Sequence, residues 1–356
     1  MIRFLRLWYE RHFTDPQVVI LALLLIFGFT IVIVAGKILA PVLAGLVIAY
    51  LLDAAVEWLQ KLRLPRMLAV VVVFTFSFAT VVVGFVSLIP LLSQQITRFF
   101  RELPNMLTKG QELLMALPEH YPQFISEQQI QDLMAQLRVE FAALGQKFVS
   151  LSLASVPGMI SLVVYAILVP LMVFFFLKDK HVILRWFEQF LPKERALAAV
   201  VWREVNVKIG SYVRGKFIEI LIVWAVAYAT FMAFGLEYAA LLSVITGLSV
   251  IIPFVGAIVA SLPVIMVAYF QWGVSEELIY VTLAYAVLQF LDGNMLVPLL
   301  FSEVVNLHPV AIILAVLLFG SIWGLWGVFF AIPLATLVHA VIRAWPVRPQ
   351  TENNAA

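Results

Sequence analysis

Long uninterrupted apolar runs are the feature that most constrains this chain. The first extends over residues 18–35, the second from Ile38 to about Leu59, and the third from about Met67 to about Leu92. A helix that spans a bilayer needs roughly 20 mostly apolar residues. The chain is 63% hydrophobic and 12% charged, whereas an average soluble domain is about 45–50% apolar and about 25% charged. The sequence therefore predicts an all-α, polytopic transmembrane protein and argues against a soluble enzyme.

Further apolar runs follow, and together with the first three they predict about eight membrane segments. They cover residues 153–177, 217–234, 239–271, 278–300 and 309–342. The N-terminal residues are basic and amphipathic, but no small-residue cleavage site follows the first run. That run is therefore interpreted as a retained first helix rather than a signal peptide.

The distribution of Lys and Arg predicts how the chain threads the membrane. Basic residues concentrate at the N-terminus, in the turn after the second run, in residues 178–216 and at the C-terminus. Because cytoplasmic loops carry an excess of Lys and Arg, we expect a bacterial inner (cytoplasmic) membrane protein with both termini in the cytoplasm. The resulting organisation is N-terminal transmembrane helices in 1–92, an extracytoplasmic amphipathic helical segment in 93–152, a transmembrane helix in 153–177, a cytoplasmic basic amphipathic segment in 178–216, a C-terminal transport core in 217–345 and a disordered tail in 346–356.

The two polar segments show helical periodicity. In 93–152, apolar residues recur in steps of three and four, which predicts two amphipathic helices that extend the third and fourth spans, with Pro104 kinking or ending the first. Their apolar seam covers either the membrane surface or the protein itself, or it forms a subunit contact in a homo-oligomer. In 178–216, one face carries Leu197, Val201, Val205, Ile209 and Tyr212. This face indicates either a basic helix on anionic lipid or a simple connector.

The last third of the chain contains interrupted apolar segments. One carries Pro253, Gly256 and Pro263, and the other carries Gly320, Gly324, Gly327 and Pro333. Both show glycine, a short apolar stretch and then proline. An unpaired backbone group in hydrocarbon costs several kcal/mol, so such breaks must be buried in protein or line a wet cavity. Paired interruptions indicate a transporter site, formed by two broken or re-entrant helices that approach the midplane from opposite sides. Close packing through small residues is the alternative.

Ionisable residues inside apolar runs add candidates for this site. Asp292 lies between apolar stretches, with Gly293, Asn294 and Pro298 after it. Gly293 and Pro298 are expected to loosen the helix as a hinge, so that the Asp292 carboxylate and Asn294 lie beside freed carbonyls and bind a sodium ion, a proton or a solute. An ordinary turn at the interface is the alternative. Glu219 either joins this site or reaches the interface from the start of its helix.

Enzymatic, metal and nucleic-acid functions find no support in the sequence. The chain has no cysteine, a formal net charge of +2, and no zinc-protease, phosphate-loop or nucleophile-elbow motif. We therefore predict no catalytic residue, no metal site, no cofactor and no nucleic-acid partner.

Several stretches, taken in this order, resemble the autoinducer-2 exporter-like (AI-2E) transporter family, and within it the PerM-type permeases. They are IGSYVRGKFIE at 209–219, IIPFVG at 251–256, QFLDGNMLVP at 289–298, NLHP at 306–309 and GLWGVFFAIP at 324–333. The resemblance covers most of the chain. It implies a multi-pass inner-membrane permease with about eight spans, assigned in some members to autoinducer-2 export and in others to sodium or lithium–proton exchange.

The resulting expectation is a secondary transporter that exports a small polar solute such as autoinducer-2. Its substrate or ion site would include Asp292, Asn294 and Glu219 with the two breaks, and its partners would be membrane lipids, a small solute or Na⁺/H⁺, and further copies of the chain. A sodium or lithium/proton antiporter and a non-transporting membrane scaffold are the alternatives.

Overall fold

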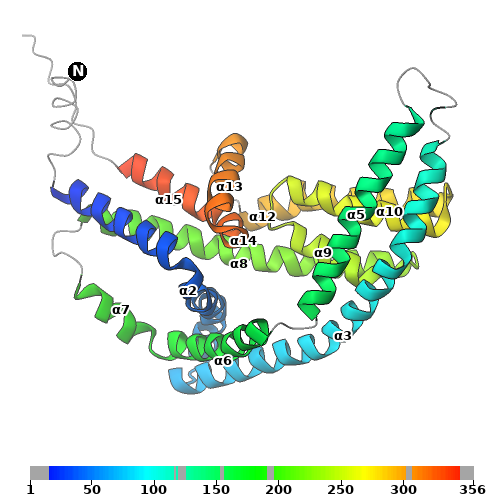
Figure 1. Cartoon of the computed structure of the whole chain (residues 1–356). Coiled ribbons are helices and arrows are strands. Elements are labelled where there is room, and N and C mark those ends of the chain that lie inside the picture. Colours follow the sequence, from blue (N-terminus) through cyan, green and yellow to red (C-terminus); the bar gives the residue numbers. More distant parts are fainter. Residues whose placement is uncertain are drawn as a thin grey trace, which may run out of the picture.

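The structure, a computed structural model, describes residues 16–115, 118, 126–152, 156–190, 196–301 and 307–344. Throughout these residues the regular structure is helical, with no strand (Figure 1). Five helices are long and apolar enough to cross a membrane, and shorter apolar helices accompany them. The expected all-α polytopic membrane fold is thus confirmed. The N-terminal residues 1–15 and the predicted tail 346–356 lie outside the described residues.

The N-terminal half forms a bundle of three long helices. They are α2 (Pro16–Lys61), α3 (Arg66–Met115) and α6 (Val156–Lys178). The first two predicted apolar runs belong to the single helix α2, which contains Pro41 and changes direction partway along (Figure 1). Proline removes a backbone donor and is the common cause of such a bend. The bundle core is apolar and includes Ala49, Val56, Val70, Val73, Val173 and Leu177.

The outer polar segment folds back on the chain itself. α3 continues through Pro104 and bends in its second half, and α5 (Glu127–Ser152) packs beside it (Figure 1). Ile130 and Met134 on the seam of α5 are buried within the chain, as is Leu103 on α3. At these residues the apolar seam is therefore covered by other parts of the same chain.

The inner polar segment divides differently from the expectation. α7 (Lys180–Glu188) follows α6, and α8 (Ala196–Ala233) then runs as one unbroken helix across the expected boundary at residue 217. Val201 and Val205 pack against α2 and α15 (Ala331–Ala344). At these two residues this face of α8 is therefore a protein contact, so lipid does not cover it there.

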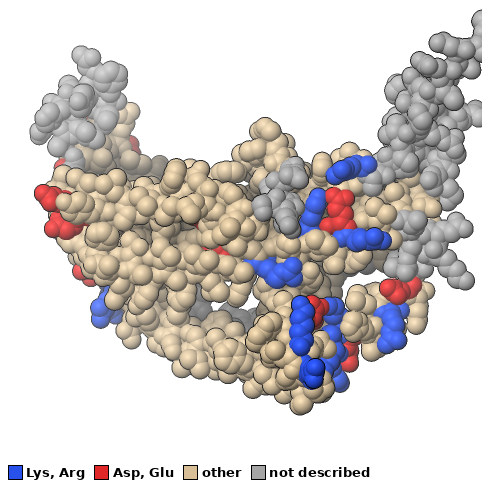
Figure 2. Space-filling model, turned by 180° about the vertical axis from the view of Figure 1, so that it is seen from behind, with Lys and Arg blue, Asp and Glu red and all other residues tan. Residues whose placement is uncertain are grey.

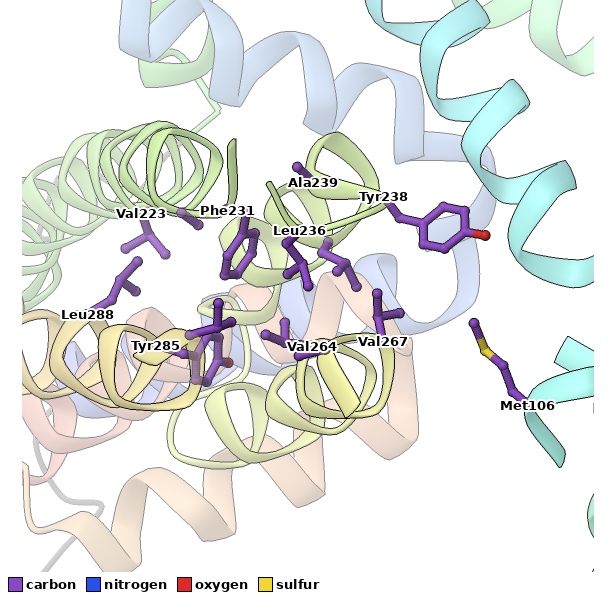
Figure 3. Close-up of a cluster of buried hydrophobic side chains, with 14 of the residues drawn as sticks. Met106, Val223, Phe231, Leu236, Tyr238, Ala239, Val264, Val267, Tyr285 and Leu288 are labelled. Atoms are coloured by element: carbon purple, nitrogen blue, oxygen red, sulfur yellow. The ribbon is translucent and has the colours of Figure 1, made fainter. Parts of the chain in front are cut away.

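The C-terminal half surrounds α8. Four helices follow it, α9 (Ala239–Ser249), α10 (Val255–Trp272), α11 (Glu276–Leu291) and α12 (Val297–Phe301), with a π-helix η1 (Asp292–Leu296) between the last two. Then come α13 (Pro309–Trp323), α14 (Leu325–Phe329) and α15. The largest apolar cluster joins α8, α9, α10 and α11, and Met106 of α3 reaches it (Figure 3).

Two ends of the molecule can be defined from this arrangement. The α7 end carries α7, the start of α8 and the end of α15, and the α5 end carries α5 and the end of α3 (Figure 1). Between the N-terminal bundle and α8 the space-filling view shows an opening (Figure 2). On the face shown, Lys and Arg gather mainly at the α7 end (Figure 2).

Candidate functional site

Both interrupted segments are broken helical hairpins that share two local features. Backbone φ is positive at Phe254, between α9 and α10, and at Gly324, between α13 and α14. Shortly after each break a buried glycine packs on the preceding arm, so that a Cβ would overlap the Ser249 carbonyl at Gly256 and the Phe319 carbonyl at Gly327. Only glycine allows this approach. The glycine–proline pattern thus marks two equivalent tips, with Pro263 and Pro333 in the arms that follow.

The first arm of each hairpin is too short to cross a membrane. α9 has 11 residues and α13 has 15, which at 1.5 Å per residue gives roughly 17 Å and 23 Å. The hydrocarbon core is about 30 Å thick. The re-entrant alternative is therefore the one that the structure supports, rather than two straight spans.

The helices that follow the two breaks, α10 and α15, run in opposite directions along α8. α10 runs toward the end of α8, where Val264 and Val267 share a cluster with Phe231. α15 runs toward its start, where Ala340 packs with Val201 and Val205. The two breaks therefore both lie near the middle of α8, and the helices that follow them run toward opposite ends of it.

A buried lysine of α8 closes the first break. Lys216 Nζ donates a 2.8 Å hydrogen bond to the Val250 carbonyl and lies 2.7 Å from Glu219 Oε2. Lys216 is 4% exposed and Glu219 is 1% exposed, so the ion pair is withdrawn from solvent. A buried carboxylate requires such a partner. The alternative in which Glu219 reaches the interface is wrong, because α8 begins at Ala196 and Glu219 lies deep within it.

Asp292 lies beside this ion pair at the start of η1. It interacts electrostatically with both Lys216 and Glu219, and η1 packs on α8. Its Oδ1 atom is buried and has no hydrogen-bond partner among the described residues. The predicted loosening of the helix is a π-helical turn, a feature frequently found at functional sites. Asn294 Nδ2 donates a 2.9 Å hydrogen bond to the Phe290 carbonyl, one turn earlier in the same stretch of helix. This amide therefore bonds to the main chain of its own helix rather than to Asp292.

The second break lies one turn away on α8. Tyr212 packs on Phe329 of α14 and on Phe301 of α12, with ring centroids 6.1 and 5.6 Å apart. The Lys216 ammonium in turn lies 5.3 Å from the centre of the Phe301 ring. Phe301 therefore contacts two α8 residues, Tyr212, which packs on Phe329 near the second break, and Lys216, which bonds to the first. On α15, the buried Thr336 hydroxyl has no hydrogen-bond partner among the described residues.

The other predicted site residues are glycines and prolines, which have no polar side-chain group, and they lie at or near the two tips and the π-turn. Pro253 lies in the first break, Gly293 lies in η1 with open space around it, and Pro298 lies in α12. Lys216 and Thr336 were not among the site residues predicted from the sequence. The i, i+3 spacing of Lys216 and Glu219 in an apolar helix was the signal that could have indicated a buried pair.

A multi-pass helical protein with two inverted broken hairpins at a buried polar cluster belongs to the class of membrane transporters. Residues 20–347 match the family described as AI-2E family transporter. The chain therefore belongs to the AI-2E transporter family, and it is a secondary transporter.

Curated relatives agree with this family membership. PerM of Escherichia coli (strain K12), named as a permease, is 43% identical over 97% of this chain and 98% of its own length. YrrI of Bacillus subtilis (strain 168), named as a transport protein, is 28% identical over 90% of each chain. The AI-2 transport protein TqsA of Escherichia coli (strain K12) is 24% identical over 90% of this chain and 92% of its own.

Proposed function

We propose that this chain is an inner-membrane exporter of a small polar solute and that the solute or its coupling cation binds at Asp292, beside Lys216 and Glu219. The observation that carries the proposal is the buried, unpartnered Asp292 Oδ1 in a π-turn, next to the meeting point of two hairpin tips. A buried polar atom without a partner is costly, so a cation or a donor group of a solute would satisfy it. The name of TqsA makes autoinducer-2 the first solute to test.

A sodium or lithium–proton antiporter is the second candidate. Its support is the electrostatic coupling of two acidic side chains, Asp292 and Glu219, across a single buried ammonium at Lys216. Two carboxylates near one buried ammonium, of which Glu219 alone is ion-paired with it, give a site where a proton and a metal ion compete.

Asp292→Asn is expected to reduce transport to background, because the amide removes the charge that the cation or solute donor would meet. The measurement is flux in proteoliposomes with imposed sodium and proton gradients, with and without autoinducer-2. Solute flux in the unmodified protein supports the exporter, and cation-driven proton movement without solute supports the antiporter.

The matched control is Asp132→Asn, the same chemical change at an exposed position of α5. We expect its flux to equal that of the unmodified protein. Full transport by Asp292→Asn, in protein that is folded and correctly inserted, would exclude the proposed site.

We also propose that the α7 end faces the cytoplasm, with both termini, because Lys and Arg gather there (Figure 2). The chain has no native cysteine, so single-cysteine variants carry no labelling background. An impermeant thiol reagent added to intact cells is expected to label Glu127→Cys at the start of α5. Lys61→Cys, at the end of α2, should be labelled only after permeabilisation, and the reverse result would invert the topology.

A further inference from the structure

α7 is an amphipathic helix that the other described residues leave uncovered. Among its nine residues none is buried. The aromatic side chains of Trp186, Phe187 and Phe190, the last just beyond the helix, are 53%, 56% and 69% exposed. Such a concentration of exposed aromatic surface is unusual next to solvent and marks an interaction site.

The apolar side chains lie on one side of this helix. At 100° per residue, Ile183, Phe187 and Phe190 fall together with Val182 and Trp186 on the same arc. The opposite arc carries His181, Arg185, Glu188 and Gln189. Trp186 forms edge-to-face contacts with both neighbouring phenylalanines, with centroids 5.0 and 4.8 Å apart, so the three rings form one continuous patch.

The position of α7 relative to the membrane is fixed by its neighbours. α6, an apolar helix, ends at Lys178, only two residues before α7 begins. Lys180 is tied to the end of α2 by hydrogen bonds to Asp53 and Glu57. Burial lowers the pKa of Lys180, but the hydrogen bonds and charges of these two carboxylates outweigh it and raise that pKa. The ion pair therefore persists at neutral pH and holds the helix where the span leaves the bilayer.

We propose that α7 lies along the bilayer interface, with its aromatic patch inserted at the boundary between phospholipid headgroups and acyl chains. The occupant of the patch is phospholipid, because aromatic side chains concentrate at this depth and because the helix starts where a spanning helix ends. Its polar arc then faces water, in the manner of an interfacial helix. The segment 178–216 thus contains a membrane-surface helix, but in α7 rather than on the 197–212 face.

The test uses the full-length chain in lipid nanodiscs with one environment-sensitive fluorophore on a single cysteine. The chain has no cysteine of its own. Phe187→Cys and Phe190→Cys sample the apolar arc, and His181→Cys and Arg185→Cys are matched controls on the polar arc. We expect emission at shorter wavelength and strong quenching by lipids with a quencher near the headgroup at the first two positions. At the two control positions we expect quenching by aqueous iodide instead.

Two results would overturn the proposal. The first is equal exposure to iodide at all four positions, which would place α7 in water. The second is efficient cross-linking between two copies at Phe190→Cys together with loss of the lipid quenching, which would make a second copy of the chain the occupant. Transport activity does not enter the readout, so the result is independent of the proposed substrate.

Discussion

Lys216→Met is expected to destabilise the protein by about 3–5 kcal/mol, the usual cost of removing one partner from a buried ion pair. The change leaves the Glu219 carboxylate, which is 1% exposed, without its cation, and it leaves the Val250 carbonyl at the first break without its 2.8 Å hydrogen bond. Both losses fall at the point where α8 holds the hairpin tip. The measurement is thermal unfolding of purified protein in a fixed detergent, followed by flux in proteoliposomes.

A double variant separates the ion pair from simple loss of packing. Lys216→Met combined with Glu219→Gln removes both charges, and we expect it to recover much of the stability, because a buried pair replaced by neutral groups is often close to neutral in free energy. The matched control is Lys208→Met, which breaks a more exposed i, i+4 pair with Glu204. Such pairs are worth about 0–1 kcal/mol. A Lys216→Met protein as stable as the Lys208 variant would contradict the role assigned to the buried pair.

The all-helical membrane fold and the two breaks could be predicted from the sequence because both depend on local chemistry. Apolar runs of about 20 residues leave few alternatives in a bilayer. The repeated pattern at Gly256 and Gly327 marks positions where the backbone approaches a carbonyl too closely for any Cβ. Asp292 stood out for a similar reason, since a charge between apolar stretches is costly and therefore functional or paired.

The features that could not be predicted from the sequence depend on tertiary contacts. The freed carbonyl expected to face a cavity is in part satisfied by Lys216, from a helix more than thirty residues earlier, and no local pattern specifies that pairing. The face with Val201 and Val205 has the periodicity of a lipid-facing helix, but α15 and α2 cover it. Periodicity shows which face is apolar, and it cannot show whether lipid or protein covers that face.

Gly256→Ala and Gly327→Ala are expected to prevent each hairpin tip from packing on the arm that precedes it. In each case the added Cβ would overlap a main-chain carbonyl of the preceding arm, Ser249 in the first hairpin and Phe319 in the second. Backbone atoms cannot move aside as a flexible side chain can, so we expect a cost at or above about 3 kcal/mol, the upper end of the range for overpacking. The tips set the position of the buried cluster, and flux should therefore fall together with stability.

Gly84→Ala is the control, because nothing lies within 4 Å of a Cβ at that position of α3. In a helix interior alanine is favoured over glycine by about 1 kcal/mol, so this variant should be equal to or more stable than the unmodified protein. The same Gly→Ala substitution is thus expected to lower stability at the tips and to keep or raise it in a span. Because an added Cβ would lie 1.7 Å from a main-chain oxygen at Gly256 and 1.8 Å from one at Gly327, the two tip variants should lose comparable stability. A large loss at only one of them would show that the hairpins are not equivalent, whatever their common sequence pattern.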